Sequence, residues 1–378
     1  MKPELYAWDE RSFSDKIRLP SEWFFDDKDQ KRADAKAAAR KTVRDEEVVV
    51  LGDADADGLG GVAVVREYYD AEVPFVPCGP HGADLYMGDA LWVCVDDLKD
   101  GATVIIQDVC VDAEWKVKAL PKVAEKAGEI LWFDHHEWDD DVAEFVRQHV
   151  DVLEIDTGTD DADAGVFEAR CGAMMLRDYY EASGHSFSES FNELVDVTGE
   201  YDLWRLRDDR CFDLNDLSHV VDHDEYVTLV RTHGADIMND ERAAEDIAEY
   251  REEQTALHDA AIDNAEYVDV GPWTVATVYG NCPANDVAES MRERGLADVC
   301  AFIKPHGGMS FRGSENFERC HEVAEAFSGG GHPKAAGGYA GDHFTSLMDY
   351  AEHWTTDGEA VKELVMDAFR DLAPEQTA

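Results

Sequence analysis

Short apolar runs alternate with helical stretches through the first 140 residues of the chain. The run Val48–Leu51 ends in the turn GDADADGLGG, and Val62–Tyr69 then has the pattern of a helix that leaves this turn. The runs Val73–Val76, Thr103–Gln107 and Glu129–Phe133 are rich in β-branched and aromatic residues and are separated by helical stretches. Because strand and helix signals alternate, the pattern predicts an α/β fold with a parallel sheet and crossover helices.

Other patterns flank this region. An Ala-rich stretch of mixed charge before residue 47 predicts an exposed helix, and residues 162 to about 250 read as mostly helical. Beyond a polar helical segment, the runs WTVATVYG, DVCAFIKP and GMSFRG indicate a second unit with strand, helix and strand signals. We therefore expect a partly helical N-terminal extension at 1–46, a catalytic domain at 47–238, a helical linker at 239–266 and a smaller α/β domain at 267–378.

The chain is strongly acidic. It contains 84 Asp and Glu residues against 34 Lys and Arg residues, which gives a net charge of -50, and no lysine occurs between Lys126 and Lys304. Hydrophobic residues make up 44% of the chain, enough to bury sizeable cores, so we expect a globular protein. The acidic bias is typical of haloarchaeal proteins, because molar salt shortens the Debye length to about 3 Å and screens the repulsion.

Several classes of protein are disfavoured by composition. No stretch approaches the roughly 20 consecutive apolar residues of a membrane-spanning helix. The segment MKPELYAWDERSFSDK lacks the cationic start and apolar run of a signal peptide, so we expect a location in a high-salt cytoplasm and no membrane partner. The eight cysteines form no CxxC pair, which argues against a disulfide framework and a structural zinc site.

Acidic and histidine residues gather where the predicted strands end. Ligands in parallel α/β sheets bind beyond the carboxyl ends of strands, because loops from neighbouring strands meet there. Carboxylates with one or two imidazoles suit Mn²⁺ or Mg²⁺ better than Zn²⁺. A calcium loop is disfavoured because Val64 stands where its bidentate glutamate would be. The pattern matches two metal ions bridged by a carboxylate, and its members are Asp53, Asp55, Asp57, Asp108, Asp134, His135 and His136.

A second candidate site is the Gly-rich SGGGHPKAAGG near the C-terminus. Successive glycines let backbone N–H groups approach an anion, and neighbouring cations add charge and donors. An arginine in MSFRG could clamp a phosphate group. The predicted substrate-binding residues are Arg312, Gly329, Gly330, Gly331, His332 and Lys334.

Taken in order, these motifs resemble the DHH phosphoesterase superfamily with its DHH-associated C-terminal domain. The matching segments are LGDADADG, IIQDV, DHH, GEYDLW around Asp202, and GGGHPKAAGG preceded by MSFRG. The resemblance covers roughly residues 47 to 340. It implies a parallel-sheet DHH domain, a helical connection and a smaller α/β domain, with the active site in the cleft between the two domains.

The resemblance also implies a ligand set for two Mn²⁺ ions, with Mg²⁺ or Co²⁺ as possible substitutes. Asp53, Asp55 and Asp108 would hold one ion, while Asp57, Asp108, His135 and Asp202 would hold the other, so that Asp108 bridges. The catalytic residues would be Asp108, His136, which would face the phosphate, and Asp134, which would orient a histidine.

The resemblance leaves several substrates open. The spacing of the second half is most similar to oligoribonucleases, so the main hypothesis is an Mn²⁺-dependent phosphodiesterase that degrades short oligonucleotides to nucleoside 5′-monophosphates. The first motif, however, begins with Asp53, as it does in RecJ-type exonucleases, whereas many oligoribonuclease relatives have His at this position. The alternative hypothesis is therefore a RecJ-like 5′ exonuclease that acts on single-stranded DNA in DNA repair. Two other functions remain open: hydrolysis of cyclic di-AMP or 3′-phosphoadenosine-5′-phosphate, and a regulatory subunit that binds nucleotides without hydrolysing them. A homodimer is also possible.

Overall fold

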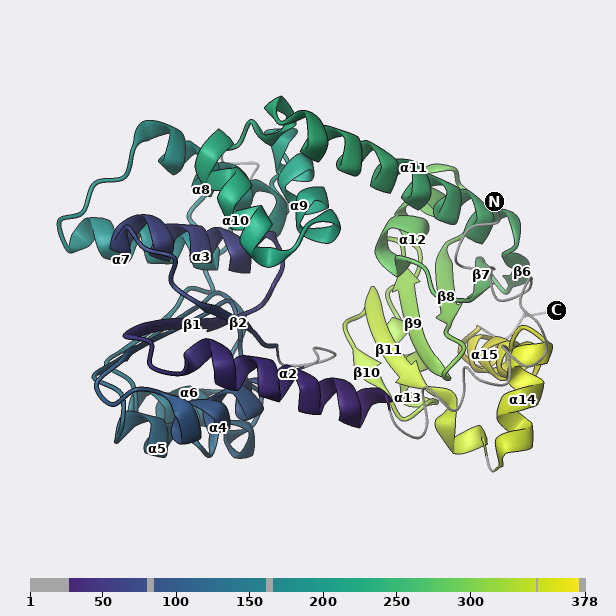
Figure 1. Ribbon diagram of the computed structural model, residues 1–378. Helices are drawn as coiled ribbons and strands as arrows, with labels where there is room; N and C mark the ends of the chain where they lie inside the picture. The colour runs from purple at the N-terminus through teal and green to yellow at the C-terminus, as the bar shows by residue number, and fades with distance from the viewer. Residues whose placement is uncertain (1–26, 80–84, 161–165, 345, 374–378) are drawn as a thin grey trace. The chain divides into compact units, whose positions relative to one another are not determined.

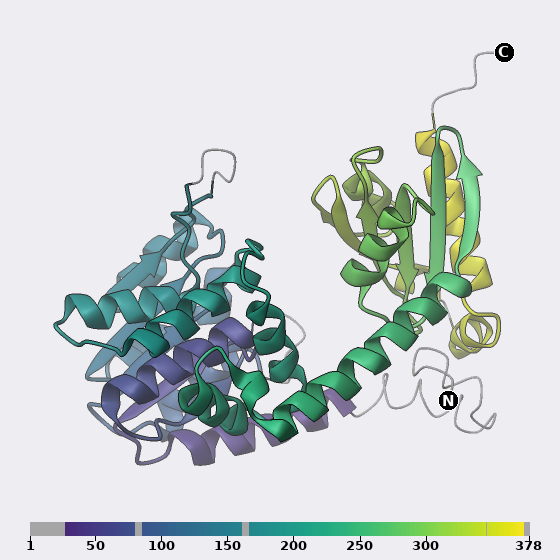
Figure 2. The same cartoon turned by 90° about the horizontal axis from the view of Figure 1, so that it is seen from above.

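The computed structural model describes residues 27–79, 85–160, 166–344 and 346–373 (Figure 1). The first 26 residues of the predicted N-terminal extension lie outside this set. The described residues form two compact units, Lys28–Tyr250 and the part from Arg251 onward. The division falls inside α11 (Glu241–Asp263), within the segment expected to be a linker and drawn in Figure 2 as one unbroken helix.

A five-stranded parallel sheet organises the first unit. The strands lie in the order β2-β1-β3-β4-β5, and every pairing is parallel. Their carboxyl ends therefore meet at one edge of the sheet. The strands are β1 (Val48–Gly52), β2 (Phe75–Pro77), β3 (Thr103–Gln107), β4 (Glu129–Asp134) and β5 (Val152–Ile155).

Helices cover both faces of this sheet, and each face has its own apolar core. Alternating strand residues separate the cores, because Val50 packs with α3 and α7 whereas Val49 and Leu51 pack with α2 and α4. Figure 1 shows α3 and α7 on one side of the sheet and α2 and α4 on the other. On the first face lie α3 (Ala56–Tyr69), α7 (Gly172–Ala182), α8 (Glu189–Asp202), α9 (Arg210–Val220), α10 (His223–His233) and the 3₁₀ turn η4 (Ile237–Asn239). On the second lie α2 (Asp27–Val43), α4 (Met87–Asp97), the 3₁₀ turn η3 (Glu114–Val117), α5 (Leu120–Ala124) and α6 (Asp140–Arg147).

The second unit is built on a mixed six-stranded sheet with the order β10-β11-β9-β8-β7-β6. Only β7 and β8 pair in parallel. Its strands are β6 (Glu266–Val270), β7 (Trp273–Tyr279), β8 (Val299–Ile303), β9 (Gly308–Gly313), β10 (Gly330–Gly331) and β11 (Ala335–Tyr339). Its helices are α12 (Ala284–Glu293), α13 (Cys320–Glu325), the 3₁₀ turn η5 (Ala340–His343), α14 (Leu347–Thr355) and α15 (Glu359–Leu372).

The predicted fold class is confirmed: a parallel-sheet α/β unit precedes a helical region and a smaller α/β unit. The predicted strand Thr103–Gln107 has the observed bounds, and β1 and β4 each extend one residue further than predicted. Four strands were not predicted: β5, β6, and the pair β10 and β11 within the segment expected to be a Gly-rich loop. None of the helices in the described parts of the chain combines the length and apolar character needed to cross a membrane.

Candidate metal centre and phosphate-binding loop

The turn after β1 places three aspartates at the strand edge. Asp53 follows the strand directly, and its carboxylate accepts a hydrogen bond from the Ala54 N–H at 2.7 Å. Asp55 caps α3 by accepting from the Gly58 N–H at 2.9 Å. A Cβ on Gly58 would lie 2.1 Å from the Asp53 carbonyl oxygen, so only glycine permits this turn.

Asp57 lies in the first turn of α3 and is buried. Its two carboxylate oxygens accept hydrogen bonds from the N–H groups of Gly172 at 2.7 Å and Ala173 at 2.9 Å. These are the first residues of α7, and the free N–H groups of a helix start favour a negative charge. A Cβ on Gly172 would lie 2.9 Å from the Asp57 carboxylate. The contact fixes Asp57 and anchors α7 at the strand edge.

Asp108 comes directly after β3 and is almost fully buried. Its backbone has a φ of 52°, in the left-handed region that a residue with a side chain seldom adopts. Its N–H donates to the Phe133 carbonyl at 3.0 Å, and the Trp132 indole donates to the Val109 carbonyl at 3.0 Å. Two residues of β4 therefore hold this turn in place through hydrogen bonds. The structure thus keeps a strained conformation that turns a carboxylate into the site.

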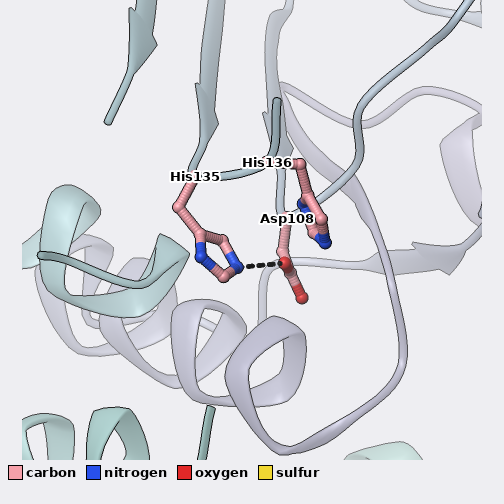
Figure 3. Close-up of side chains that lie close together, drawn as sticks. All are labelled: Asp108, His135 and His136. Carbon is pink, nitrogen blue, oxygen red and sulfur yellow. Dashed lines mark ion pairs between the residues drawn. The ribbon is translucent and has the colours of Figure 1, made fainter. Parts of the chain in front are cut away.

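The two histidines of the DHH motif have different surroundings. His136 Nδ1 lies 2.8 Å from the carboxylate of Asp134, a residue that has no solvent exposure and also accepts a hydrogen bond from Trp138. His135 Nε2 instead lies 3.3 Å from Asp108 Oδ1 and 3.3 Å from Asp202 Oδ2. Figure 3 shows Asp108, His135 and His136 together beyond the ends of β3 and β4.

Polar atoms converge here without hydrogen-bond partners. Among the described residues, buried His135 Nε2 and Asp202 Oδ2 form no hydrogen bond, although each has the other at 3.3 Å. Leaving such atoms unpaired costs about 1–3 kcal/mol each. A divalent cation would satisfy both together with Asp108, and oxygen and imidazole donors are those that Mn²⁺ and Mg²⁺ accept. The residues present therefore fit the predicted metals.

The electrostatics of the cluster agree with this fit. Burial, followed by the charges of Asp57 and Asp55, raises the pKa of Asp202 to about 8 and raises the pKa of Asp108 well above its usual range. Burial also raises the pKa of Asp53. Packing against protein atoms and the Asp57 charge raise the pKa of Asp55, although its outer edge reaches solvent. Without cations, the repulsion among these carboxylates favours their protonated forms.

His136 is stabilised in its charged form. The hydrogen bond to Asp134 is the main cause that raises the pKa of His136, and the charges of Asp202 and Asp57 add to it. The imidazole is about half exposed. Since Asp134 holds Nδ1, Nε2 is the nitrogen left for a ligand, and the orienting role of Asp134 stays a prediction.

The sequence did not single out two cysteines that lie among the potential ligand atoms. Cys171 precedes α7, and its Sγ lies with carboxylate oxygens of Asp57 and Asp202 inside one group of potential ligand atoms. Cys110 forms a comparable group with Asp134 and His136. Burial raises the pKa of the Cys110 thiol to about 11, which keeps it protonated in the metal-free protein.

The residues of the predicted substrate loop belong to the second unit, where β10 and β11 form a short antiparallel pair beside β9. Gly331 has a φ of 141°, and a Cβ on Gly329 would lie 2.0 Å from the Gly337 carbonyl oxygen, so both positions require glycine. Gly330 is exposed with open space around it. The His332 N–H donates to the Ala335 carbonyl at 2.7 Å, which closes the turn.

The two predicted cations of this loop already have partners. The Lys334 ammonium pairs with Glu315 and lies 3.4 Å from Glu318. Arg312 is on β9 opposite Ala335, and its Nε donates to Asn285 at 2.6 Å. Burial lowers the pKa of Arg312. The guanidinium is therefore positioned by neutral groups, whereas the lysine is paired with carboxylates.

Comparison with known proteins places this fold. No family model matches the sequence, and no curated protein matches it. Among solved structures, exonuclease RecJ bound to manganese aligns with a TM-score of 0.52 and 15% identity, covering 88% of this chain and 94% of RecJ. The DHH domain of a protein assigned to a family of ribosomal proteins aligns with a TM-score of 0.54 and 14% identity, covering 86% of this chain and 90% of that one. The resemblance carried by the motifs is thus confirmed at the level of the fold, which is that of the DHH proteins.

Proposed function

We propose that this protein is an Mn²⁺-dependent phosphodiesterase that hydrolyses short oligonucleotides to nucleoside 5′-monophosphates. The observation that carries the proposal is the convergence of His135 Nε2, Asp108 Oδ1 and Asp202 Oδ2, two of which have no hydrogen-bond partner among the described residues. Such an arrangement costs stability unless cations bind, and paired metals at strand ends are a recurrent device for phosphoester hydrolysis.

We assign the predicted ligands to two groups that share Asp108, as the resemblance of the motifs implies. Bound metals would lower the pKa of a water molecule and place positive charge against the phosphoryl oxygens. The chain itself supplies the orientation: the start of α7 fixes Asp57, the left-handed turn fixes Asp108, and Asp134 fixes His136. The first group consists of Asp57, Asp108, His135 and Asp202. The second group consists of Asp53, Asp55 and Asp108.

The charge of His136 gives it a role of its own. The hydrogen bond to Asp134 raises the pKa of His136 and so favours the imidazolium form, whose Nε2 can donate to a phosphoryl oxygen. Its half-exposed ring faces solvent, as a substrate contact requires. We assign His136 to the phosphate and Asp134 to the positioning of His136.

Short substrates suit the charge of the chain. At a net charge of -50, long-range attraction for a polyanion is weak, so binding rests on the metals and a few local cations. The Gly329–Gly331 turn with Arg312 would take a further phosphate or a substrate end. A RecJ-like single-strand exonuclease is the second candidate, because the RecJ structure shares this fold and Asp53 opens the first motif as in that group.

The test presents four substrates in parallel with Mn²⁺ and multimolar KCl: pApA-type RNA, long 5′-labelled single-stranded DNA, cyclic di-AMP and 3′-phosphoadenosine-5′-phosphate. The main proposal requires the highest kcat/KM on the dinucleotide, with nucleoside 5′-monophosphate as product. Processive shortening of the long DNA would instead establish the RecJ-like activity. If nucleotides bind and none is hydrolysed with Mn²⁺, the chain is a nucleotide-binding regulatory subunit.

A further inference from the structure

A cavity of about 400 Å³ lies in the first unit outside the metal ligands. The segments that form it are α2, the start of α4 and the η3 region. Gly79, which follows β2, and Val111, which follows β3, also line it. It is therefore reached from the same strand edge as Asp108, which is three residues before Val111.

Three aromatic rings line this cavity, and two of them are exposed. Trp115 has 68% of its surface exposed and Tyr86 has 39%, while Trp92 is half-buried. An exposed indole beside a cavity presents a large flat apolar surface that no described part of the chain covers. Nucleobases stack on such faces, and one stacked base contributes about 1–3 kcal/mol to nucleic-acid binding.

Cations surround the same rings. The Arg32 guanidinium lies 5.1 Å from the centre of the Tyr86 ring, the Lys116 ammonium 5.8 Å from Trp115, and the Lys122 ammonium 4.7 Å from Trp92. These are cation–π distances, and they leave charged groups at the edges of the aromatic faces. A ligand that stacks on a ring would therefore find a cation within reach of an attached phosphate.

The local charge is opposite to that of the chain. The cavity lining holds three cations, Arg32, Lys116 and Lys118, and one carboxylate, Asp89, which gives a local charge of +2 where the chain as a whole has -50. Asp89 pairs with Arg32 on α2, and Lys116 pairs with Asp112 at 2.7 Å. A positive pocket in so acidic a chain indicates a site for an anion.

Lys118 differs from the other two lining cations. It is exposed, and the described part of the chain offers it no hydrogen bond or ion pair. Its ammonium thus adds a free positive charge at the rim of the cavity. A phosphate group could bind this ammonium without breaking an existing ion pair.

We propose that this cavity binds one nucleotide unit, with the base on the Trp115 and Tyr86 faces and the phosphate at Lys118 and Lys116. The unit could belong to a substrate strand that continues from the metal centre, or be a free mononucleotide. The proposal concerns binding alone. It therefore stands or falls separately from the proposed hydrolysis.

The experiment measures binding to the full chain in EDTA, where metal-dependent hydrolysis is silent. The first probe is AMP, whose binding is measured by equilibrium dialysis. The second is a fluorescent single-stranded octanucleotide, whose binding is measured by fluorescence anisotropy. We expect saturable binding of at least one probe. Trp115→Leu should weaken it about tenfold and Lys118→Ala about threefold, while Trp115→Phe, which keeps a stacking face, should stay within about threefold of the parent chain.

The matched control is Lys99→Ala, which removes an exposed lysine that pairs with Glu47 and does not line the cavity. It should leave both probes unchanged. Weakened binding of AMP in Trp115→Leu establishes a mononucleotide site, and weakened binding of the octanucleotide alone establishes a strand site. If neither probe binds, or if Trp115→Leu binds as tightly as Trp115→Phe, the proposal is wrong.

Discussion

The metal centre and the Gly-rich turn are both expected to contact phosphate, yet they are built in opposite ways. The metal centre collects carboxylates whose pKa values are raised, and it leaves His135 Nε2 and Asp202 Oδ2 without hydrogen bonds among the described residues. The turn is already satisfied, with Lys334 held by two glutamates and Arg312 held by Asn285. The first region has unpaired polar atoms that added cations would satisfy, whereas the two cationic side chains of the second already have partners in the protein.

This difference assigns the two regions separate tasks. A cluster of buried like charges is strained until metal binds, so its affinity for metal is high and its chemistry depends on that metal. The turn adds little charge to attract an anion, and among the described residues Arg312 Nη2 is a donor that it leaves without a hydrogen bond. We therefore expect substitutions in the first region to change turnover and stability, and substitutions in the second to change KM.

The largest effect is expected from His135→Ala. Removing Nε2 takes one donor from the shared metal site while Asp108 and Asp202 stay in place. We expect kcat/KM on the best substrate to fall by about 10³-fold or more, with little change in the unfolding midpoint. His233→Ala, at the end of α10 and outside the site, is the control that should keep full activity. Turnover above a tenth of the parent value would remove His135 from the ligand set.

Asp57→Ala and Asp202→Asn should separate structural from metal-binding carboxylates. Asp57 accepts two backbone hydrogen bonds at the start of α7, so its loss should cost about 2–4 kcal/mol of unfolding free energy as well as activity. Asp202 Oδ2 has no hydrogen bond in the described residues, so Asp202→Asn should leave the metal-free protein as stable as before, or more stable. Denaturant unfolding in EDTA at fixed KCl tests both. Equal destabilisation by the two would contradict the distinction.

The effect of pH on the metal-free protein follows from Asp202. Its folded pKa of about 8 lies above the ordinary value near 4, so between these values the folded state binds more protons than the unfolded state. The stability of the metal-free protein should therefore fall as pH rises from about 4 to about 8. Mn²⁺ displaces these protons, so its affinity should rise over the same interval, and 100 Kd of Mn²⁺ should add about 2.7 kcal/mol. Thermal unfolding with EDTA or Mn²⁺ across this range checks the sign.

The parallel sheet and its acidic edge could be predicted because both leave local marks in the sequence. Buried strands such as Thr103–Gln107 have apolar centres, and β1 and β3 each lead directly into an acidic residue while β4 ends in one. The edge strand β5 could not be recognised, because all four of its residues are only half-buried and an acidic residue interrupts the run. β6 has the same difficulty, with four of its five residues exposed.

The partners of Asp57 could not be predicted from the sequence for a different reason. Gly172 and Ala173 lie more than 100 residues away, and they contribute backbone N–H groups, which every non-proline residue carries. Cys171 is one of eight cysteines that form no CxxC pair, and nothing in the neighbouring sequence sets it apart. The pairing of Lys334 with glutamates was equally hidden, because Glu315 and Glu318 are two among 84 acidic residues.

The smallest effects are expected in the Gly-rich turn, and they rank its two cations. Arg312 is positioned by neutral acceptors, and its Nη2 has no hydrogen bond among the described residues, so Arg312→Ala should raise KM about tenfold with kcat nearly unchanged. Lys334 must leave Glu315 and Glu318 to reach a phosphate, so Lys334→Ala should raise KM only about threefold. In Glu315→Gln the lysine loses its nearer carboxylate, and KM should fall below that of the parent chain. If Lys334→Ala instead has the larger effect, the ion pairs open when substrate binds and the lysine is the principal anion contact.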